Sequence, residues 1–573
     1  MPGGSQPVAR DDSSTDVVEA ASRRLWTWPL AAFVGVVASA WFFRGFFQSG
    51  FRITQGDDID GRVITLQVIH WWKPFAFGNP LDVGIFFPAP ATLGTTDALL
   101  LFGIGSWPLS LIFDSPQVAV QVFLILLSLA GYALWLYFFR GQIQAPWVLS
   151  ITGAVLLIFG NPIYVMSGNF KMLTLWLAPL PIVLITTSLR ATRRRVRIAS
   201  AIGAGVAVGL IALTSFVVVW FLFMAVMTVA VIWAALGLFA RTISTHTLAR
   251  LGQSLLPALV GLVLTLPPLL LIYLPNLDGS GTATTATGFA LALRLTELIN
   301  VSDTNLVWGP LIGELPEGLM RSDISTTLRE WQLAPTPLVL LFAAISLVVG
   351  IWTIRRTSLV QVLGLASIAA GFVFWVVPVR DFLPLPTGGT LFFFPWLWIQ
   401  DLPGADGIRY ISRFEIFAFM MLVFGLVLLI GEYLNRQVQR GQSQPLVRGI
   451  LAIALVLVVL EQVNLQPTQE TDRGRWDALS RIDSPPAECA TFAIVDEFPD
   501  TDHTWETMND ARALAWINEV PSINGFSSLE PTGWKVDNVS ESTYTQRLTD
   551  WVQANDLENV CLLSLREGTW DFL

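Results

Sequence analysis

The sequence predicts an all-α polytopic membrane protein of about eleven transmembrane helices, followed by a small C-terminal α/β domain outside the membrane. Of the 573 residues, 53% are hydrophobic and only 13% are charged, about half the charged fraction of a typical soluble protein. Several apolar runs, such as 117–139, approach the roughly 20 residues that cross a bilayer as a helix. These runs are continuous rather than alternating, which argues against a membrane β-barrel.

The distribution of arginines predicts the orientation of the spans. Arg23 and Arg24 precede the first apolar run, which predicts a cytoplasmic N-terminus. If the short run 97–113 is interfacial or re-entrant rather than a full span, every arginine-rich loop, including 190–197, lies on the cytoplasmic side. The spans are then expected near 26–47, 117–139, 146–165, 171–189, 198–214, 216–239, 251–274, 335–354, 358–379, 412–434 and 449–465.

This topology divides the chain into three parts. Residues 1–24 are polar and predicted to be a disordered cytoplasmic N-terminus. Residues 25–465 form the membrane domain, with long external loops at 48–116, 275–334 and 380–411. Residues 466–573 are predicted to be a separate acidic, soluble extracytoplasmic domain. The arginine-rich, lysine-poor chain suggests a bacterial inner (plasma) membrane protein.

The C-terminal part differs from the rest in charge and in cysteine content. It holds 20 acidic and 7 basic residues, a net charge of −13, whereas the whole chain carries −9. Such an acidic surface argues against nucleic acid as a partner. Both cysteines of the chain, Cys489 and Cys561, lie here, and an oxidising compartment would favour a disulfide between them over two buried free thiols.

The most unusual polar stretch is "TQGDDIDGRVITLQVIHWW", residues 54–72, which follows the first span closely. Asp57, Asp58 and Asp60 crowd four positions at what reads as a helix start, where Asp57 or Asp58 can cap the helix. The apolar positions of the following helix fall on one stripe, Ile59, Val63 and Leu66. We therefore expect an amphipathic helix lying on the outer leaflet.

The acidic cluster has two interpretations. One is structural: capping carboxylates plus an i, i+4 ion pair between Asp58 and Arg62. The other is functional: one carboxylate is a general base or binds a divalent cation. A helix N-terminus stabilises an anion, so we expect Asp57 to have a lowered pKa and to be ionised. His70, beside Trp71 and Trp72, is expected mainly to pack at the membrane interface.

Four motifs together resemble the bacterial GT-C superfamily of integral membrane glycosyltransferases, in particular its poorly characterised members. The first is Gly56-Asp57 after the first span, followed by the tryptophan-bearing helix. The others are the block 86–100 ("FFPAPATLGTTDALL"), the segment 168–180 ("GNFKMLTLWLAPL") and the segment 402–414 ("LPGADGIRYISRF"). Relatives often carry histidine where this chain has Asn169.

The resemblance implies transfer of a sugar from a polyprenyl-phosphate donor to an extracytoplasmic envelope acceptor, with inversion. It implies that an acid in the first external loop is the catalytic base, which is Asp57 here, with Asp58 or Asp60 as substitutes. Arg409 and Arg413, expected four residues apart on one helix face, are candidates for binding the lipid phosphate. The remaining substrate-binding candidates are Lys171, His70 and Asp97.

Two other functions compete with this hypothesis. A lipid or polysaccharide transporter would be expected to place polar residues inside the spans, whereas here they gather at the outer ends. A non-catalytic envelope assembly factor would use the C-terminal domain to bind glycans or proteins. No cofactor is required by the sequence, although a divalent cation at 57–60 fits the carboxylates, and no spacing predicts a zinc site.

Overall fold

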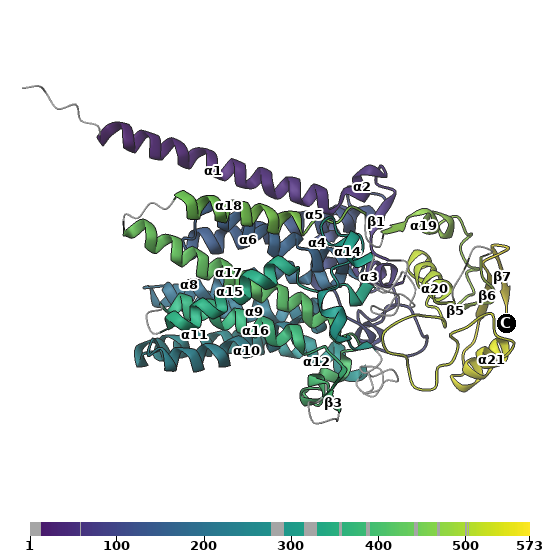
Figure 1. The fold of residues 1–573 in the computed structure, drawn as a ribbon. Helices are drawn as coiled ribbons and strands as arrows, with labels where there is room; N and C mark the ends of the chain where they lie inside the picture. Colours follow the sequence, from purple (N-terminus) through teal and green to yellow (C-terminus); the bar gives the residue numbers. More distant parts are fainter. Residues whose placement is uncertain are drawn as a thin grey trace, which may run out of the picture.

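The computed structural model describes most of the chain as a long helical bundle with a mixed α/β region at one end (Figure 1). The described residues are 13–57, 59–276, 291–313, 329–354, 358–384, 390–440, 445–466, 470–498, 501 and 504–573.

Eight described helical segments are long and apolar enough to cross a membrane. Each coincides with a span that the sequence predicts, although the seventh predicted span, 251–274, continues through a second short helix. They are Pro116–Gln142 (including α5, Pro116–Leu136), Trp147–Gly168 (including α6, Trp147–Phe159, and α7, Asn161–Val165), Phe170–Arg190 (including α8, Pro179–Arg190), α9 (Arg194–Thr214), α10 (Phe216–Phe239), α11 (Thr245–Leu264), α16 (Leu359–Val376) and Ile411–Gln439 (including α17, Phe414–Gln439).

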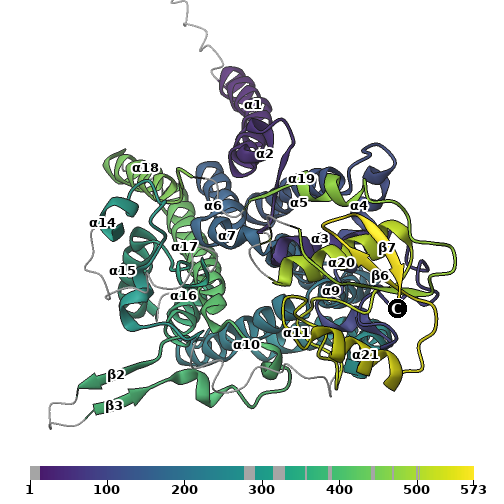
Figure 2. The same cartoon turned by 90° about the vertical axis from the view of Figure 1, so that its right-hand side faces the viewer.

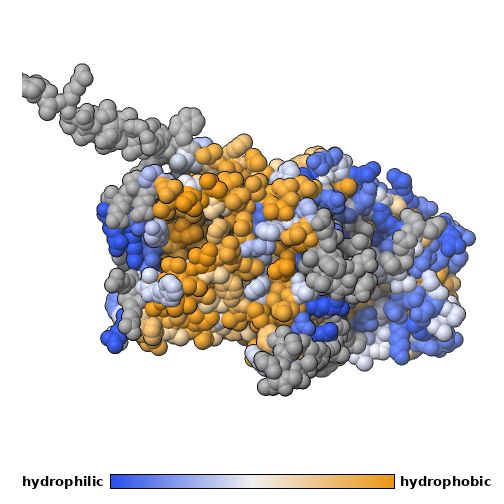
Figure 3. Space-filling view, in the orientation of Figure 1, coloured by the Kyte–Doolittle hydropathy of each residue, from blue (hydrophilic) through white to orange (hydrophobic). Residues whose placement is uncertain are grey.

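Shorter apolar helices supply the other three predicted spans. These are the segment Thr27–Phe42 of α1 (Ser13–Phe42), α15 (Pro337–Thr353) and α18 (Pro445–Leu460), beside α4 (Leu100–Ser110) and Leu266–Asn276, which contains α12 (Leu266–Tyr273). The run 97–113 forms only the 11-residue helix α4, too short for a full span. Figure 3 shows a broad apolar area on one face of the bundle, with hydrophilic surface toward both ends. The fold is therefore that of a multi-pass helical membrane protein.

The N-terminal segment differs from its prediction. Helix α1 begins at Ser13, inside the range 1–24 that the sequence predicts to be disordered, while residues 1–12 lie outside the described part. Residues 16–25 ("DVVEAASRRL") are mostly good helix formers, and they lead into the first span without a breaker, so the span continues as helix toward the N-terminus.

Short elements gather at the end of the bundle that carries the C-terminal region (Figures 1 and 2). They include α2 (Arg44–Gln48), β1 (Ile53–Gln55), α3 (Asp60–His70), α14 (Gly309–Gly313) and the projecting hairpin of β2 (Asp381–Pro384) and β3 (Thr390–Phe393). The C-terminal region contributes β4 (Glu470–Asp472), α19 (Gly474–Leu479), β5 (Thr491–Ile494), α20 (Thr504–Asn518), α21 (Tyr544–Ala554), β6 (Val560–Ser564) and β7 (Thr569–Phe572).

The C-terminal region contains a small α/β fold, as the sequence predicts. Its three strands lie in the order β5-β6-β7, with β5 parallel to β6 and β6 antiparallel to β7. Cys489 and Cys561 form the predicted disulfide, with 5.7 Å between their Cα atoms. Because Cys561 lies in the central strand, the disulfide ties the chain before β5 to the middle of the sheet.

A buried carboxylate holds the outer ends of α15 and α18 together. Glu461, directly after α18, accepts hydrogen bonds from the backbone N–H groups of Leu338 (3.1 Å) and Val339 (3.2 Å) at the start of α15. It also accepts from the indole Nε1 of Trp308 at 3.0 Å. A carboxylate is stabilised at a helix N-terminus, so this contact fixes the segment around Trp308 against the bundle.

The C-terminal region is attached to the first external loop at two places. Strand β4 pairs antiparallel with β1, so that Thr54 lies opposite Thr471. Helix α20 packs against α3, and the indole Nε1 of Trp516 donates to the carbonyl of Ile69 at 3.2 Å. Helix α3 is consequently buried along most of its length. The prediction that it lies on the lipid surface is wrong, because α4, α5 and α20 all pack against it.

Asp510 is the central polar contact of this interface. Its side chain is fully buried, and its two oxygens bind Arg62 of α3 and, at 2.6 Å, Arg475 of α19. Arg62 therefore has a partner 448 residues away in the chain. Asp58, the partner predicted for Arg62, lies outside the described residues.

We expect Asp510→Asn to weaken the attachment of the C-terminal region. The substitution leaves two guanidinium groups without their buried counter-charge, which costs about 3 kcal/mol. The measurements are the apparent Tm of the full-length protein in detergent and the protease concentration that cleaves the C-terminal region. Glu519→Gln is the matched control, because Glu519 pairs with Lys73 in an exposed ion pair worth less than about 1 kcal/mol. Equal effects of the two substitutions would contradict the central role of Asp510.

Candidate functional site

A tight turn places Asp57 at the start of α3. The backbones of Gly56 and Gly61 touch, since a Cβ atom on Gly61 would lie 2.4 Å from the Cα of Gly56. Gly56 also has a φ of +129°, a conformation that favours glycine. The Oδ1 atom of Asp57 accepts hydrogen bonds from the backbone N–H groups of Ile59 (3.1 Å) and Gly61 (3.0 Å). Asp57 thus caps the helix, which begins at Asp60.

The ionisation of Asp57 is opposite to the sequence-based expectation. Burial, followed by the neighbouring charge of Asp60, raises the pKa of Asp57 to about 8, even though the backbone N–H groups act in the lowering direction. The expected low pKa is therefore wrong. The helix N-terminus stabilises the carboxylate, but the loss of solvent destabilises it by more. Asp57 is therefore mostly protonated at neutral pH.

Asp60 contacts the motif 168–180, which forms another part of the site. Its Oδ2 atom accepts a hydrogen bond from the side-chain amide of Asn169, and the backbone N–H of Asp57 donates to the carbonyl of Gly168 at 3.3 Å. The motif 168–180 and the acidic turn are thereby brought together. Asn169, at the position where relatives often carry histidine, orients Asp60.

Arg413 also belongs to this site, but it has a carboxylate partner of its own. Its guanidinium forms a two-pronged ion pair with Glu330, with Nη2 at 2.6 Å and Nε at 3.1 Å from Oε1. It also stacks over the ring of Tyr410, 5.0 Å from the ring centre. Burial, Glu330 and Asp60 raise the pKa of Tyr410 to about 12, while Arg413 and Arg409 act in the opposite direction.

Arg409 and Arg413 do not lie on one helix face. Residues 408–410 are irregular, residues Ile411–Arg413 form a single 3-10 turn, and α17 begins only at Phe414. Arg409 instead reaches the C-terminal region, where its Nη2 donates to the carbonyl of Ser528. The i, i+4 expectation fails because the chain is not helical before α17.

Lys171 and Asp97 lie together, with the ammonium 3.6 Å from Oδ2 of the carboxylate and both side chains mostly buried. Asp97 also accepts a hydrogen bond at 2.7 Å from the backbone N–H of Phe216. The carboxylate therefore stabilises the start of α10. These two substrate-binding candidates form an ion pair with each other.

His70 lies in the interior, where its Nε2 atom is 3.0 Å from the carbonyl of Pro80. Burial, with a smaller effect from Arg512, lowers its pKa to about 4. A neutral histidine is consistent with the expected packing role. Because His70 is buried, the structure gives no support for the prediction that it binds substrate.

A metal site stays a prediction. Among the described residues, which leave out Asp58, no three His, Cys, Asp or Glu side chains are grouped so that they could hold a metal ion. Asp57 and Asp60 could supply carboxylate oxygens of the kind that divalent cations prefer.

Comparison with known proteins shows similarity at the level of structure. No family model and no curated protein matches the chain. The cryo-EM structure of the arabinofuranosyltransferase AftD from Mycobacteria aligns with 88% of this chain at 16% identity and a TM-score of 0.46, and the chain spans 32% of its length. The Archaeoglobus fulgidus oligosaccharyltransferase aligns with 94% of this chain and 69% of its own (10% identity, TM-score 0.44).

ArnT from Cupriavidus metallidurans in the apo state aligns with 95% of this chain and 93% of its own, at 12% identity and a TM-score of 0.38. A second structure of that ArnT contains undecaprenyl phosphate. Each of these alignments has a TM-score below 0.5.

The acidic turn depends on both of its glycines, and we expect Gly61→Ala to disrupt it. The added methyl group would overlap the backbone of Gly56, so the hydrogen bonds to Asp57 should be lost. The free energy of unfolding should fall by about 1–3 kcal/mol, and the measurement is the apparent Tm of the detergent-solubilised protein, which should fall with it. Gly407→Ala is the control, because a Cβ atom there meets nothing within 4 Å. An unchanged Tm for Gly61→Ala would contradict this account of the turn.

Proposed function

We propose that the chain is a membrane glycosyltransferase that moves a sugar from a polyprenyl-phosphate donor to an envelope acceptor outside the cytoplasm. The observation that carries this proposal is the Asp57 carboxyl, buried at the end of the bundle that carries the C-terminal region, with its pKa raised to about 8. A general base works best when its pKa lies near the operating pH. A carboxyl that serves only as a helix cap has no need of such a pKa.

Asp57 would act as the base during attack of an acceptor hydroxyl. The hydroxyl oxygen bonds to the anomeric carbon while Asp57 takes the proton, and the bond from that carbon to the phosphate oxygen breaks, which releases polyprenyl phosphate. Attack from the face opposite the leaving group inverts the anomeric centre. The ArnT structure that contains undecaprenyl phosphate is consistent with a donor of this chemical class.

The departing phosphate needs positive charge nearby, and three basic residues are candidates. Arg413 is matched by Glu330 and Lys171 by Asp97, so each would serve within an ion pair rather than as an isolated cation. Arg409 donates to the carbonyl of Ser528 in the C-terminal region, and its charge acts to lower the pKa of Glu530. We therefore keep all three as phosphate-binding candidates, with Arg413 also balancing Asp60 and Glu330.

One observation favours the transporter alternative. Glu415, in the first turn of α17, is fully buried, and neither carboxylate oxygen has a hydrogen-bond partner among the described residues. Ionisable residues inside membrane segments are often functional. Glu415 lies at the outer end of its helix rather than near the membrane centre, where transporters bind their substrates, and we therefore prefer glycosyl transfer.

We expect Asp57→Asn to reduce sugar transfer by about 10²–10⁴-fold, the contribution of a general base. The measurement compares envelope glycans and lipid-linked sugars of cells that express the wild type or the variant, with the amount of membrane-inserted protein checked in parallel. Asp401→Asn is the control, because Asp401 is exposed in an external loop. Normal glycans in the Asp57→Asn cells would remove Asp57 from the proposed role.

The pH dependence of transfer tests the raised pKa. A base must be deprotonated to act, so the initial rate in isolated membranes should rise with pH to a plateau, with a midpoint near pH 8. Asp60→Asn removes the negative charge that raises the pKa of Asp57, so the midpoint should move to lower pH. A midpoint that stays in place or moves upward in this variant would argue against Asp57 as the titrating group.

A further inference from the structure

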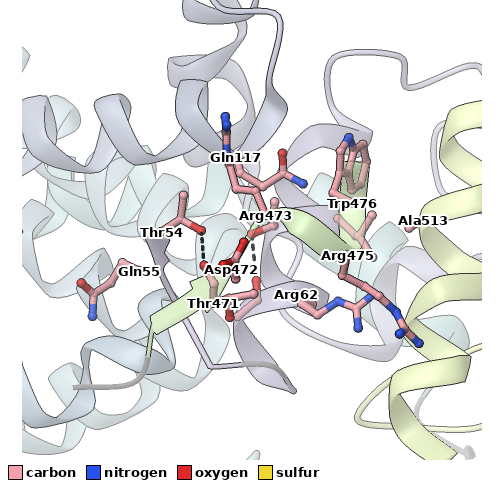
Figure 4. A pocket seen from close by; sticks show the side chains of 13 residues that line it. Thr54, Gln55, Arg62, Gln117, Thr471, Asp472, Arg473, Arg475, Trp476 and Ala513 are labelled. Atoms are coloured by element: carbon pink, nitrogen blue, oxygen red, sulfur yellow. Dashed lines mark hydrogen bonds between the residues drawn. The ribbon is translucent and has the colours of Figure 1, made fainter. Parts of the chain in front are cut away.

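A pocket lies between the first long loop and the C-terminal region, where α3 and α19 both contribute lining residues (Figure 4). Its enclosed volume is about 40 Å³, which is room for the anionic group of a ligand whose remainder lies outside the pocket. Its lining residues are Thr54, Gln55, Gly61, Arg62, Thr65, Leu66, Gln117, Thr471, Asp472, Arg473, Arg475, Trp476 and Ala513.

The pocket carries more positive than negative charge. Three arginines line it, and two of them, Arg62 and Arg475, share the buried carboxylate of Asp510. The one lining carboxylate, Asp472, is itself paired with Arg52 at 3.1 Å. The C-terminal region is otherwise strongly acidic, so a cluster of arginines here is not explained by the general charge of its surface.

Arg473 carries a side-chain N–H group that has no acceptor among the described residues. Its Nε atom is buried and has no hydrogen-bond partner among the residues that the structure describes. A buried donor without an acceptor costs about 1–3 kcal/mol, and such groups in native proteins commonly mark an unseen ligand, ion or water. Arg62 lies nearby and donates to Asp510 through Nη2, although a guanidinium has five N–H donors.

The chemistry of the lining identifies the class of ligand. Arginines favour phosphate and carboxylate groups, while Trp476 offers an aromatic ring and Thr65 and Gln117 offer polar groups suited to hydroxyls. A pocket with this composition fits a sugar that carries an anionic group. Two of its arginines and its tryptophan come from the soluble C-terminal region, which favours a saccharide over a lipid headgroup.

The pocket and the acidic turn share one residue. Gly61 lines the pocket, and its backbone N–H donates to Asp57. We propose that this pocket binds the phosphate or carboxylate of an envelope saccharide and forms the acceptor side of the enzyme. The assignment to the acceptor rests on the proposed function, whereas binding of the anionic sugar does not.

Binding of glucose 6-phosphate to the full-length protein in detergent tests the proposal. Titration calorimetry should show saturable binding that is stronger than binding of glucose or inorganic phosphate. Arg473→Gln should weaken it roughly tenfold to a hundredfold, the effect expected for a lost hydrogen bond to a charged group. Arg481→Gln is the matched control, since it removes an exposed arginine of the C-terminal region that does not line the pocket, and it should leave the affinity unchanged within about twofold.

A second variant covers the case in which Arg473→Gln fails to fold. Gln117→Glu places a negative charge in the first turn of α5, where a helix tolerates it well, and it should abolish binding without lowering the Tm. Equal losses in Arg473→Gln and Arg481→Gln, equal affinity for inorganic phosphate, or binding only to phosphatidylglycerol vesicles would each overturn the proposal. No donor is present in this assay, so its failure would leave the role of Asp57 untouched, and a failed transfer assay would leave the pocket untouched.

Discussion

Burial of α3 from two sides is the constraint on which the external end of the molecule depends. The membrane bundle contacts its N-terminal turn through Gly168 and Asn169, and α20 covers its length from the C-terminal region. Removing water from a carboxylate disfavours its charged form, so the acidic turn acquires chemistry that the same residues would not have on an exposed helix. The high pKa of Asp57 is a consequence of this packing.

The same packing makes the C-terminal region part of the site rather than an appendage. Asp510 joins Arg62 and Arg475 in one buried cluster, and Ser528 accepts a hydrogen bond from Arg409. Strand β4 pairs with β1, the strand that leads into the acidic turn. Residues of α3, of the loop 380–411 and of the C-terminal region thus contact the same few charged side chains. A change in the position of the C-terminal region relative to the bundle would therefore alter the surroundings of Asp57, even without direct contact to Asp57 itself.

The sequence predicts those features that depend on neighbouring residues. The spans follow from continuous apolar runs, the disulfide from two cysteines in one small domain, and the capping role of Asp57 from its place before α3. It does not predict features that depend on distant partners. Arg62 binds Asp510, 448 residues away, and Arg413 binds Glu330, 83 residues away. The buried position of Asp57 also depends on a distant segment, since its backbone N–H donates to Gly168, so local helix rules gave the wrong direction for its pKa.

The central claim is that packing, rather than local sequence, sets the ionisation of Asp57. Infrared difference spectroscopy of the purified protein measures this directly, because a protonated carboxyl has a C=O stretching band that its anion lacks. We predict a band that disappears with a midpoint near pH 8 and that is absent from Asp57→Asn. Loss of that band below pH 5, or an identical titration in Asp57→Asn, would contradict the account.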